Sequence, residues 1–105
     1  MTDMRHTHLR NVDLNLLLAL HALLEERHVT RAAKRCVLSQ PAMSRALERF
    51  RETFGDRLLI RSGRAYERTV RGDSLLRELQ SLLPRLESMA RTGFRSAEKP
   101  GTISN

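Results

Sequence analysis

Side chains that can recognise DNA bases lie close together near the middle of the sequence. Gln40 carries an amide whose donor and acceptor match adenine in the major groove, and Arg45 carries two parallel donors that match guanine. Ser39 and Pro41 both favour the start of an α-helix, Ser39 as the N-cap and Pro41 because a first-turn amide has no acceptor within the helix. We therefore predict a helix that Ser39 caps and that exposes Gln40, Ser44 and Arg45 for binding.

This helix is predicted to cover residues 39–54, because Gly55 can adopt the left-handed conformation that ends helices. Apolar residues recur at spacings of three and four on the side opposite the polar residues. They are Met43, Leu47, Phe50 and Phe54. On the exposed side, Arg49 is expected either to reach DNA or to pair with Glu52 or Thr53 of the same helix.

A shorter helix precedes this one and meets it at a tight turn. Thr30 can cap a helix over residues 30–37. Thr30 and Arg31 at the helix start are predicted to hold a phosphate, as are the amides near Ser39, while Lys34 is expected to contribute affinity for any DNA sequence. Two short helices in this order predict a helix-turn-helix.

The positive charge of the chain is concentrated on this motif and the segment after it. The formal net charge is +7, with 19 Lys and Arg against 12 Asp and Glu. Between Arg27 and Arg71 there are twelve basic and four acidic residues, which leaves seven basic and eight acidic residues elsewhere. A basic segment that coincides with a helix-turn-helix favours a nucleic-acid partner over a merely solvated surface.

A β-hairpin, or wing, is predicted after the long helix, with strands over 58–61 and 65–68. Arg61, Arg64 and Arg68 lie at its tip and shoulders, where they could reach phosphates or a narrow minor groove. A hairpin that is only solvated is the alternative.

Two leucine-rich helices flank these elements. The first begins at Asp13 and extends to about Arg27, and its leucines occupy two sides, one for the core and one for a further helix or a second subunit. The last is capped by Thr69 and is expected to end near Thr92, with Gly93 as its stop. Its leucines form a coiled-coil-like seam that predicts homodimerisation. They are Leu75, Leu76, Leu79, Leu82, Leu83 and Leu86.

Several function classes are not favoured by the sequence. Cys36 is the only cysteine, so neither an intrachain disulfide nor a thiolate metal cluster is possible. We find no phosphate-binding glycine loop, no His-Glu-x-x-His and no nucleophile with a base, so an enzyme is not expected, and neither is a cofactor or metal. No apolar run approaches the roughly 20 residues that cross a bilayer. We expect a cytoplasmic, nucleoid-associated protein.

The order of these features strongly resembles the DNA-binding region of LysR-type transcriptional regulators of bacteria. The resemblance covers about residues 9–92, and its specific part is Thr30-Arg31-Ala32-Ala33 with Ser39-Gln40-Pro41-Ala42-Met43-Ser44-Arg45. It implies a mainly α winged helix-turn-helix, with a three-helix core and a small β-hairpin, followed by a long linker helix that pairs with a second subunit. It also implies double-stranded DNA as partner, contacted by Gln40, Pro41, Ser44 and Arg45, with Arg61 or Arg64 as the wing arginine.

These features together predict four successive regions along the chain. We expect a flexible leader at 1–8, the DNA-binding domain at 9–72 with its helix-turn-helix at about 29–48 and its wing at about 58–68, the linker helix at 73–92, and a disordered tail at 93–105. We expect this chain to lack the ligand-sensing effector domain that the family places next, and therefore expect no small-molecule inducer for it. Two alternatives remain: an interaction protein that forms mixed dimers with a full-length regulator, and a winged-helix regulator of another, MarR-like family.

Overall fold

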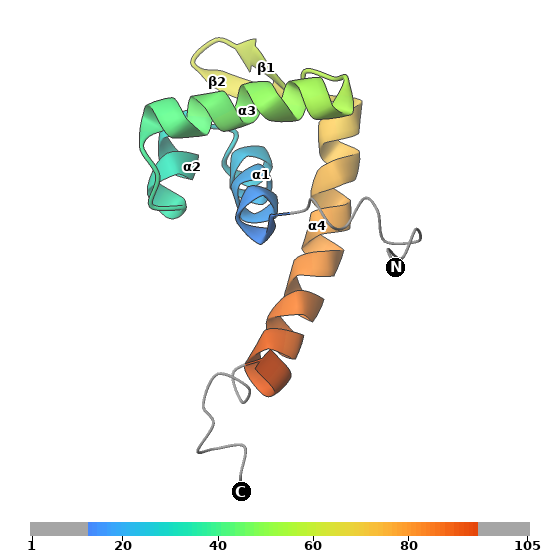
Figure 1. Cartoon of the computed structure of the whole chain (residues 1–105). Coiled ribbons are helices and arrows are strands. Elements are labelled where there is room, and N and C mark those ends of the chain that lie inside the picture. Colours follow the sequence, from blue (N-terminus) through green and yellow to red (C-terminus); the bar gives the residue numbers. More distant parts are fainter. Residues whose placement is uncertain (1–12, 95–105) are drawn as a thin grey trace, which may run out of the picture.

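The computed structural model describes residues 13–94 of the chain. Their elements are α1 (Leu14–Glu26), α2 (Val29–Arg35), α3 (Gln40–Phe54), β1 (Leu59–Ser62), β2 (Ala65–Arg68), α4 (Val70–Met89) and the π-helical turn η3 (Ala90–Phe94). Figure 1 shows α3 lying across α1 and α2, the hairpin beside α3, and α4 projecting away from them. The predicted winged helix-turn-helix followed by a long helix is confirmed. The leader at 1–8 and residues 95–105 of the tail lie outside the described residues.

Three of the predicted helix caps are confirmed by hydrogen bonds from first-turn amides. The Asp13 carboxylate accepts from the Asn15 N–H at 2.8 Å, and the Ser39 hydroxyl accepts from the Ala42 N–H at 3.2 Å. The Thr69 hydroxyl accepts from the Gly72 N–H at 3.0 Å. Each cap satisfies an amide that would otherwise lack an acceptor within its helix.

Three predicted helix boundaries are wrong. Helix α2 begins one residue earlier than predicted, at Val29, and ends two residues earlier, at Arg35. Its N-cap is His28 instead of Thr30. His28 has an extended backbone, and its Nδ1 accepts a hydrogen bond from the Arg31 N–H at 3.2 Å. Gly93 does not end the last helix, because the chain continues from α4 into η3 and passes through Gly93 to Phe94. Glycine ends a helix only where it takes a positive φ, as Gly55 does at +60°.

The hairpin is the predicted wing with its first strand moved by one residue. Strands β1 and β2 are antiparallel, Ser62 pairs with Ala65, and Gly63 supplies the positive φ of the two-residue turn. Leu58, predicted to open the strand, instead adopts a left-handed φ of +67° and buries its side chain completely. Its N–H donates to the Asp56 carboxylate and its carbonyl accepts from the Thr69 N–H, at 2.7 and 2.9 Å. These two bonds explain how a leucine is held in a conformation that β-carbons disfavour.

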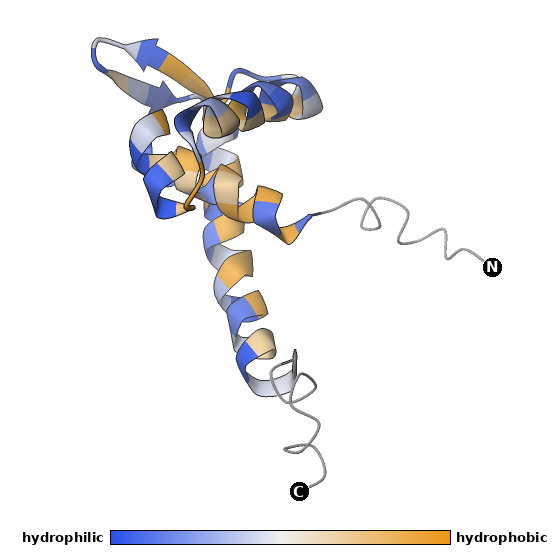
Figure 2. Cartoon of the chain, turned by 60° about the vertical axis from the view of Figure 1, so that its left-hand side comes forward, coloured by the Kyte–Doolittle hydropathy of each residue, from blue (hydrophilic) through white to orange (hydrophobic). Residues whose placement is uncertain are grey.

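The core is aliphatic and is shared by all four α-helices and the start of β1. Its residues are Ala19, Leu20, Ala22, Leu23, Leu24, Ala32, Ala33, Met43, Leu47, Phe50, Leu58, Leu59, Leu75, Leu76 and Leu79. Helix α1 contacts α2, α3 and α4, so the further helix expected on its second side is α4. Figure 2 shows the apolar sides of the helices turned toward one another, and a hairpin whose strands carry both apolar and polar residues. Leu14 and Leu18 of α1 stay 52% and 44% exposed.

Helix α4 divides the predicted leucine seam into two parts. Leu75, Leu76 and Leu79 are only 8%, 7% and 5% exposed, because they pack in the core of their own chain. This corrects the prediction that all six leucines face a partner. Leu82 is 40% exposed, and Leu83 and Leu86 are half-buried on the part of α4 that extends beyond the core. Helix α4 continues through Pro84 as one element.

Candidate nucleic-acid interface

The first turns of α3 present the predicted base-contacting residues. Gln40, Pro41, Arg45 and Arg49 are exposed, and Ser44 is half-buried. The predicted opposite side is buried, since Met43, Leu47 and Phe50 are 0%, 4% and 7% exposed. Burial of that side fixes the rotation of α3 about its axis, so the polar residues must face away from the core.

A polar cleft of about 220 Å³ lies between α2, the start of α3 and the hairpin. It is lined by His28, Val29, Thr30, Gln40, Arg61, Arg64 and Tyr66. Four predicted DNA-contacting residues from three separate segments therefore meet at one place: Thr30, Gln40, Arg61 and Arg64. The structure does not bring Arg45 and Arg49 to this cleft; they line a separate hollow of about 470 Å³ between α3 and the start of α1. The candidate interface therefore includes the cleft at Gln40 and continues along α3 to Arg45 and Arg49.

Most of the lysine and arginine side chains that are predicted to contact DNA have no acidic partner within residues 13–94. Within residues 13–94, Lys34, Arg45, Arg49, Arg61 and Arg64 form no ion pair. Arg49 therefore does not take the Glu52 pairing that the sequence left open. Arg31 differs from these residues, because its guanidinium lies 3.5 Å from the Glu26 carboxylate. An exposed cation without an ion pair can contact a phosphate at little free-energy cost, because no existing ion pair must be broken first.

Other arginines of the basic segment hold the fold together. Arg51 donates from Nε to the Arg57 carbonyl and from Nη2 to the Leu59 carbonyl, both at 2.9 Å, and so ties the start of β1 to α3. Arg68 pairs with Asp73 at 2.7 Å and donates to the Leu24 carbonyl at 2.8 Å. The prediction that Arg68 contributes to the wing's outer surface is therefore wrong. Its register position opposite Leu59 points it toward the body of the domain.

Two residues of the cleft were missed by sequence reasoning. Tyr66 lies directly opposite Arg61 in the hairpin, and the Arg61 guanidinium carbon is 5.7 Å from the centre of the Tyr66 ring. The strand alternation could have placed these two residues on one face. His28 joins the cleft as the cap of α2. No local signal identified it, because histidine is not among the preferred N-cap residues.

Three titratable groups beside the interface have perturbed pKa values. Hydrogen bonds from the Thr69 hydroxyl and the Leu58 N–H lower the pKa of Asp56. Its hydrogen bond and ion pair with Arg35 lower the pKa of Glu25. Burial raises the pKa of the Cys36 thiol, which disfavours its thiolate form.

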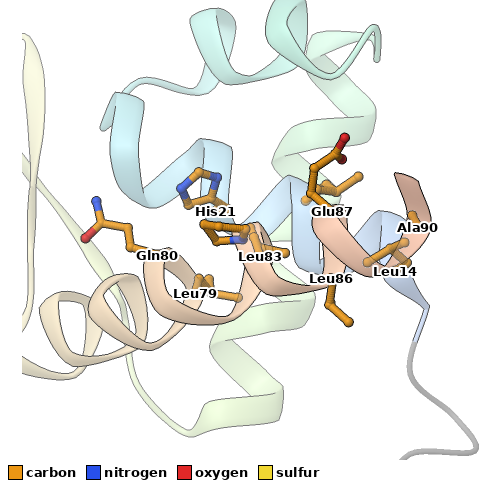
Figure 3. Close-up of a pocket in the computed structure, with 10 residues that line it drawn as sticks. Leu14, His21, Leu79, Gln80, Leu83, Leu86, Glu87 and Ala90 are labelled. Atoms are coloured by element: carbon orange, nitrogen blue, oxygen red, sulfur yellow. The ribbon is translucent and has the colours of Figure 1, made fainter. Parts of the chain in front are cut away.

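An apolar groove of about 450 Å³ runs between the start of α1 and the outer half of α4. Its walls include the exposed Leu14 and Leu18 of α1 and the half-buried Leu83 and Leu86 of α4, and His21 and Glu87 also line it. Figure 3 shows lining residues of both helices, with His21 of α1 next to Leu83 of α4. The groove includes Leu83 and Leu86 of the predicted leucine seam, whereas the exposed Leu82 does not line it. Among the described helices, none has the length and apolarity needed to cross a membrane.

Comparison with known proteins identifies the family. The family model described as bacterial regulatory helix-turn-helix protein, lysR family, matches residues 14–73, more than half of the chain. The regulator SyrM of Rhizobium etli is 49% identical over 81 residues, which is 77% of this chain and 24% of SyrM. Nodulation protein D of Azorhizobium caulinodans is 48% identical over 79 residues, covering 75% of this chain and 25% of that protein. The chain thus spans about a quarter of the length of these relatives.

Solved structures agree with this assignment. The crystal structure of the BenM_DBD/catB site 1 DNA complex matches with a TM-score of 0.72 at 29% identity, over 82% of this chain and 97% of that one. The probable transcriptional regulator PA0477 of Pseudomonas aeruginosa matches with a TM-score of 0.71 at 36% identity, over 78% of this chain and 27% of that one. A MarR-like family, considered from the sequence, is not favoured by these matches. The chain belongs to the lysR family of bacterial helix-turn-helix regulators.

Proposed function

We propose that the chain binds double-stranded DNA as a homodimer, with α3 in the major groove and the hairpin against the neighbouring backbone or minor groove. One observation carries the proposal: exposed Gln40 shares a cleft with Arg61 and Arg64 of the hairpin, while Arg45 and Arg49 are exposed further along the same helix. None of these four arginines forms an ion pair within residues 13–94. Relatives of similar fold have been solved as complexes with DNA. Because the proposed ligand is chromosomal DNA, we place the protein in the bacterial cytoplasm, at the nucleoid.

Each residue of the interface has a role in this proposal. Arg45 donates two hydrogen bonds to guanine, and Gln40 pairs with adenine. Pro41 and Ser44 contact base edges or sugar beside them, and Arg49 reaches the flanking phosphates. Thr30, Arg31 and Lys34, with the amides at Ser39, hold the backbone. The partner subunit docks against the outer half of α4, at the exposed Leu82 and at Leu83 and Leu86 of the groove. Two copies of α3 then enter successive major grooves about one helical turn apart.

Selection from a random DNA library tests the proposal directly. An enriched inverted repeat is expected, because a symmetric dimer reads two copies of one half-site. Affinity for the selected duplex should fall steeply with salt, with a slope that corresponds to about six or more released phosphate counterions per dimer. No enrichment over random duplex, together with binding that is indifferent to salt, would contradict the proposal.

Two substitutions separate base reading from phosphate contact. Arg45→Ala should cost about 1–3 kcal/mol on the selected duplex and relax its sequence preference. Lys34→Ala should weaken binding to selected and random duplexes about equally. Arg77→Ala, which removes an exposed positive charge from α4, is the matched control and should change neither affinity by more than a small factor. Equal losses on both duplexes for Arg45→Ala would contradict its assignment as a base reader.

The sequence also left open an interaction protein that captures a full-length regulator in mixed dimers. The comparisons do not favour it, since the family match and the DNA complexes both concern the helix-turn-helix. Mixing the chain with a full-length relative and measuring DNA retention separates the two functions. Retention of DNA by the chain alone supports direct binding, and loss of the relative from DNA without such retention supports capture.

A further inference from the structure

The polar cleft between α2, α3 and the hairpin has the composition of an anion site. Its volume is about 220 Å³, two arginines line it, and no acidic residue does. Arg61 and Arg64 form no ion pair with any carboxylate in residues 13–94. The cleft also has polar neighbours on its opposite wall, Thr30 and Gln40, so an occupant could be held from both sides.

His28 offers the cleft a hydrogen-bond donor of defined identity. Its Nδ1 accepts a hydrogen bond from the Arg31 backbone N–H at 3.2 Å, so the neutral ring carries its hydrogen on Nε2. Within the described part of the chain, Nε2 has no hydrogen-bond partner. The ring is half-buried and lines the cleft. The cap therefore fixes both the position of the ring and the nitrogen that can donate.

Tyr66 defines where Arg61 lies. The two residues are directly opposed across the hairpin, with the guanidinium carbon 5.7 Å from the ring centre, within the range of a cation–π contact. Tyr66 is itself half-buried and packs against the core, so the ring cannot follow a moving arginine. Restricting a long side chain before binding removes part of the entropy that binding would otherwise cost.

We propose that this cleft holds one phosphate group of the DNA backbone between the reading helix and the wing. In it, His28 Nε2–H donates to a phosphate oxygen, Arg61 and Arg64 supply the charge, and Tyr66 is a positioning residue for Arg61. This inference rests on the proposed function and adds His28 and Tyr66 to the interface. The same oxyanion chemistry is offered by free phosphate, so the test includes both sources.

The His28 test removes the imidazole and keeps the helix cap. Serine is as good an N-cap as any residue, so His28→Ser should melt like the wild type. It should nevertheless bind a random-sequence 30-base-pair duplex about tenfold more weakly by fluorescence anisotropy, with a shallower salt dependence. His28→Asp also caps α2 and should weaken binding further, because its charge repels the phosphate. If both variants bind like the wild type, His28 only caps α2 and the assignment is overturned.

The Tyr66 test uses conservative rescue and a double-mutant cycle. Tyr66→Phe keeps the ring face and should bind like the wild type, whereas Tyr66→Leu keeps apolar bulk without that face and should lose about fivefold. In an Arg61→Ala background, Tyr66→Leu should cause no additional loss, because Tyr66 acts through Arg61. A similar loss in both backgrounds would overturn the positioning role.

Titration with inorganic phosphate, followed by NMR of the labelled protein, distinguishes the two sources of the anion. We expect the amides around the cleft to shift with duplex and to show no saturable shift with inorganic phosphate. Saturable shifts with inorganic phosphate, combined with normal duplex binding by the variants, would overturn the DNA assignment. If the wild-type chain binds no duplex, the proposed function itself is refuted. If the wild-type chain binds duplex and the His28 and Tyr66 variants bind it equally well, only this inference is refuted.

Discussion

Gly72 is the position where the structure makes the sharpest stability prediction. It lies in the first turn of α4, where a β-carbon would stand 2.5 Å from the Leu58 carbonyl oxygen. That oxygen belongs to the backbone and already accepts the Thr69 N–H at 2.9 Å. The Leu58 N–H is in turn held by Asp56. The carbonyl cannot rotate away without breaking the junction between the hairpin and α4.

The expected cost of Gly72→Ala follows from two opposing effects. Overpacking typically costs about 1–3 kcal/mol, and a 2.5 Å contact with backbone belongs at the upper end of that range. Alanine in place of glycine within a helix stabilises the folded state by about 0.5–1 kcal/mol. The net loss of unfolding free energy should therefore be ~1–2 kcal/mol. For a domain of this size each kcal/mol lowers the melting temperature by about 4–8 °C, so we expect a fall of roughly 5–15 °C.

Thermal unfolding followed by circular dichroism measures this effect. Ser81→Ala, at an exposed position of the same helix, is the control and should change the melting temperature little. A Gly72→Ala protein that melts at or above the wild-type temperature would contradict this prediction. It would mean that α4 and the Leu58 carbonyl are not in the close contact described.

Three further predictions concern the wing, acid stability and the dimer. Arg51→Ala should destabilise the domain by about 1–2 kcal/mol in chemical denaturation, because it removes the bonds to the Arg57 and Leu59 carbonyls; an unchanged midpoint would contradict this. Asp56 has a lowered pKa in the folded state. Its contribution to the free energy of unfolding is therefore complete above the unfolded-state pKa of about 4, and it is lost as pH falls through the folded-state pKa. The melting temperature of the wild type should therefore drop more between pH 6 and pH 3 than that of Asp56→Asn, and parallel profiles would exclude the effect. Leu82→Asp places a charge on an exposed apolar side chain of α4 and should shift the protein to monomer in analytical ultracentrifugation, whereas Ser81→Asp should not.

Local features of the fold were predictable from the sequence because they depend on neighbouring residues. Caps at Asp13, Ser39 and Thr69 act within one helical turn, and the apolar spacing along α3 fixes its buried side. The cap of α2 was predicted incorrectly, since Thr30 is the better N-cap residue by type and the chain uses His28. Thr30 does not act as the cap because the helix already starts at Val29. Packing of Ala32 and Ala33 in the core can fix that start, since the preference of a residue type for the N-cap position is weak by comparison.

Residue order alone indicated which region is basic, which helix exposes polar side chains to a ligand and that some leucines still need to be covered. Which cations are available to a ligand depends instead on contacts between segments that are distant in the chain. Arg68 is committed to the Leu24 carbonyl, 44 residues away in the chain, while Arg61 and Arg64 stay unpaired beside Gln40. Folding likewise divided the leucines of α4 between the core and the open groove. Hydrogen bonds and apolar contacts between distant segments form only when the whole chain packs, so no local pattern records them.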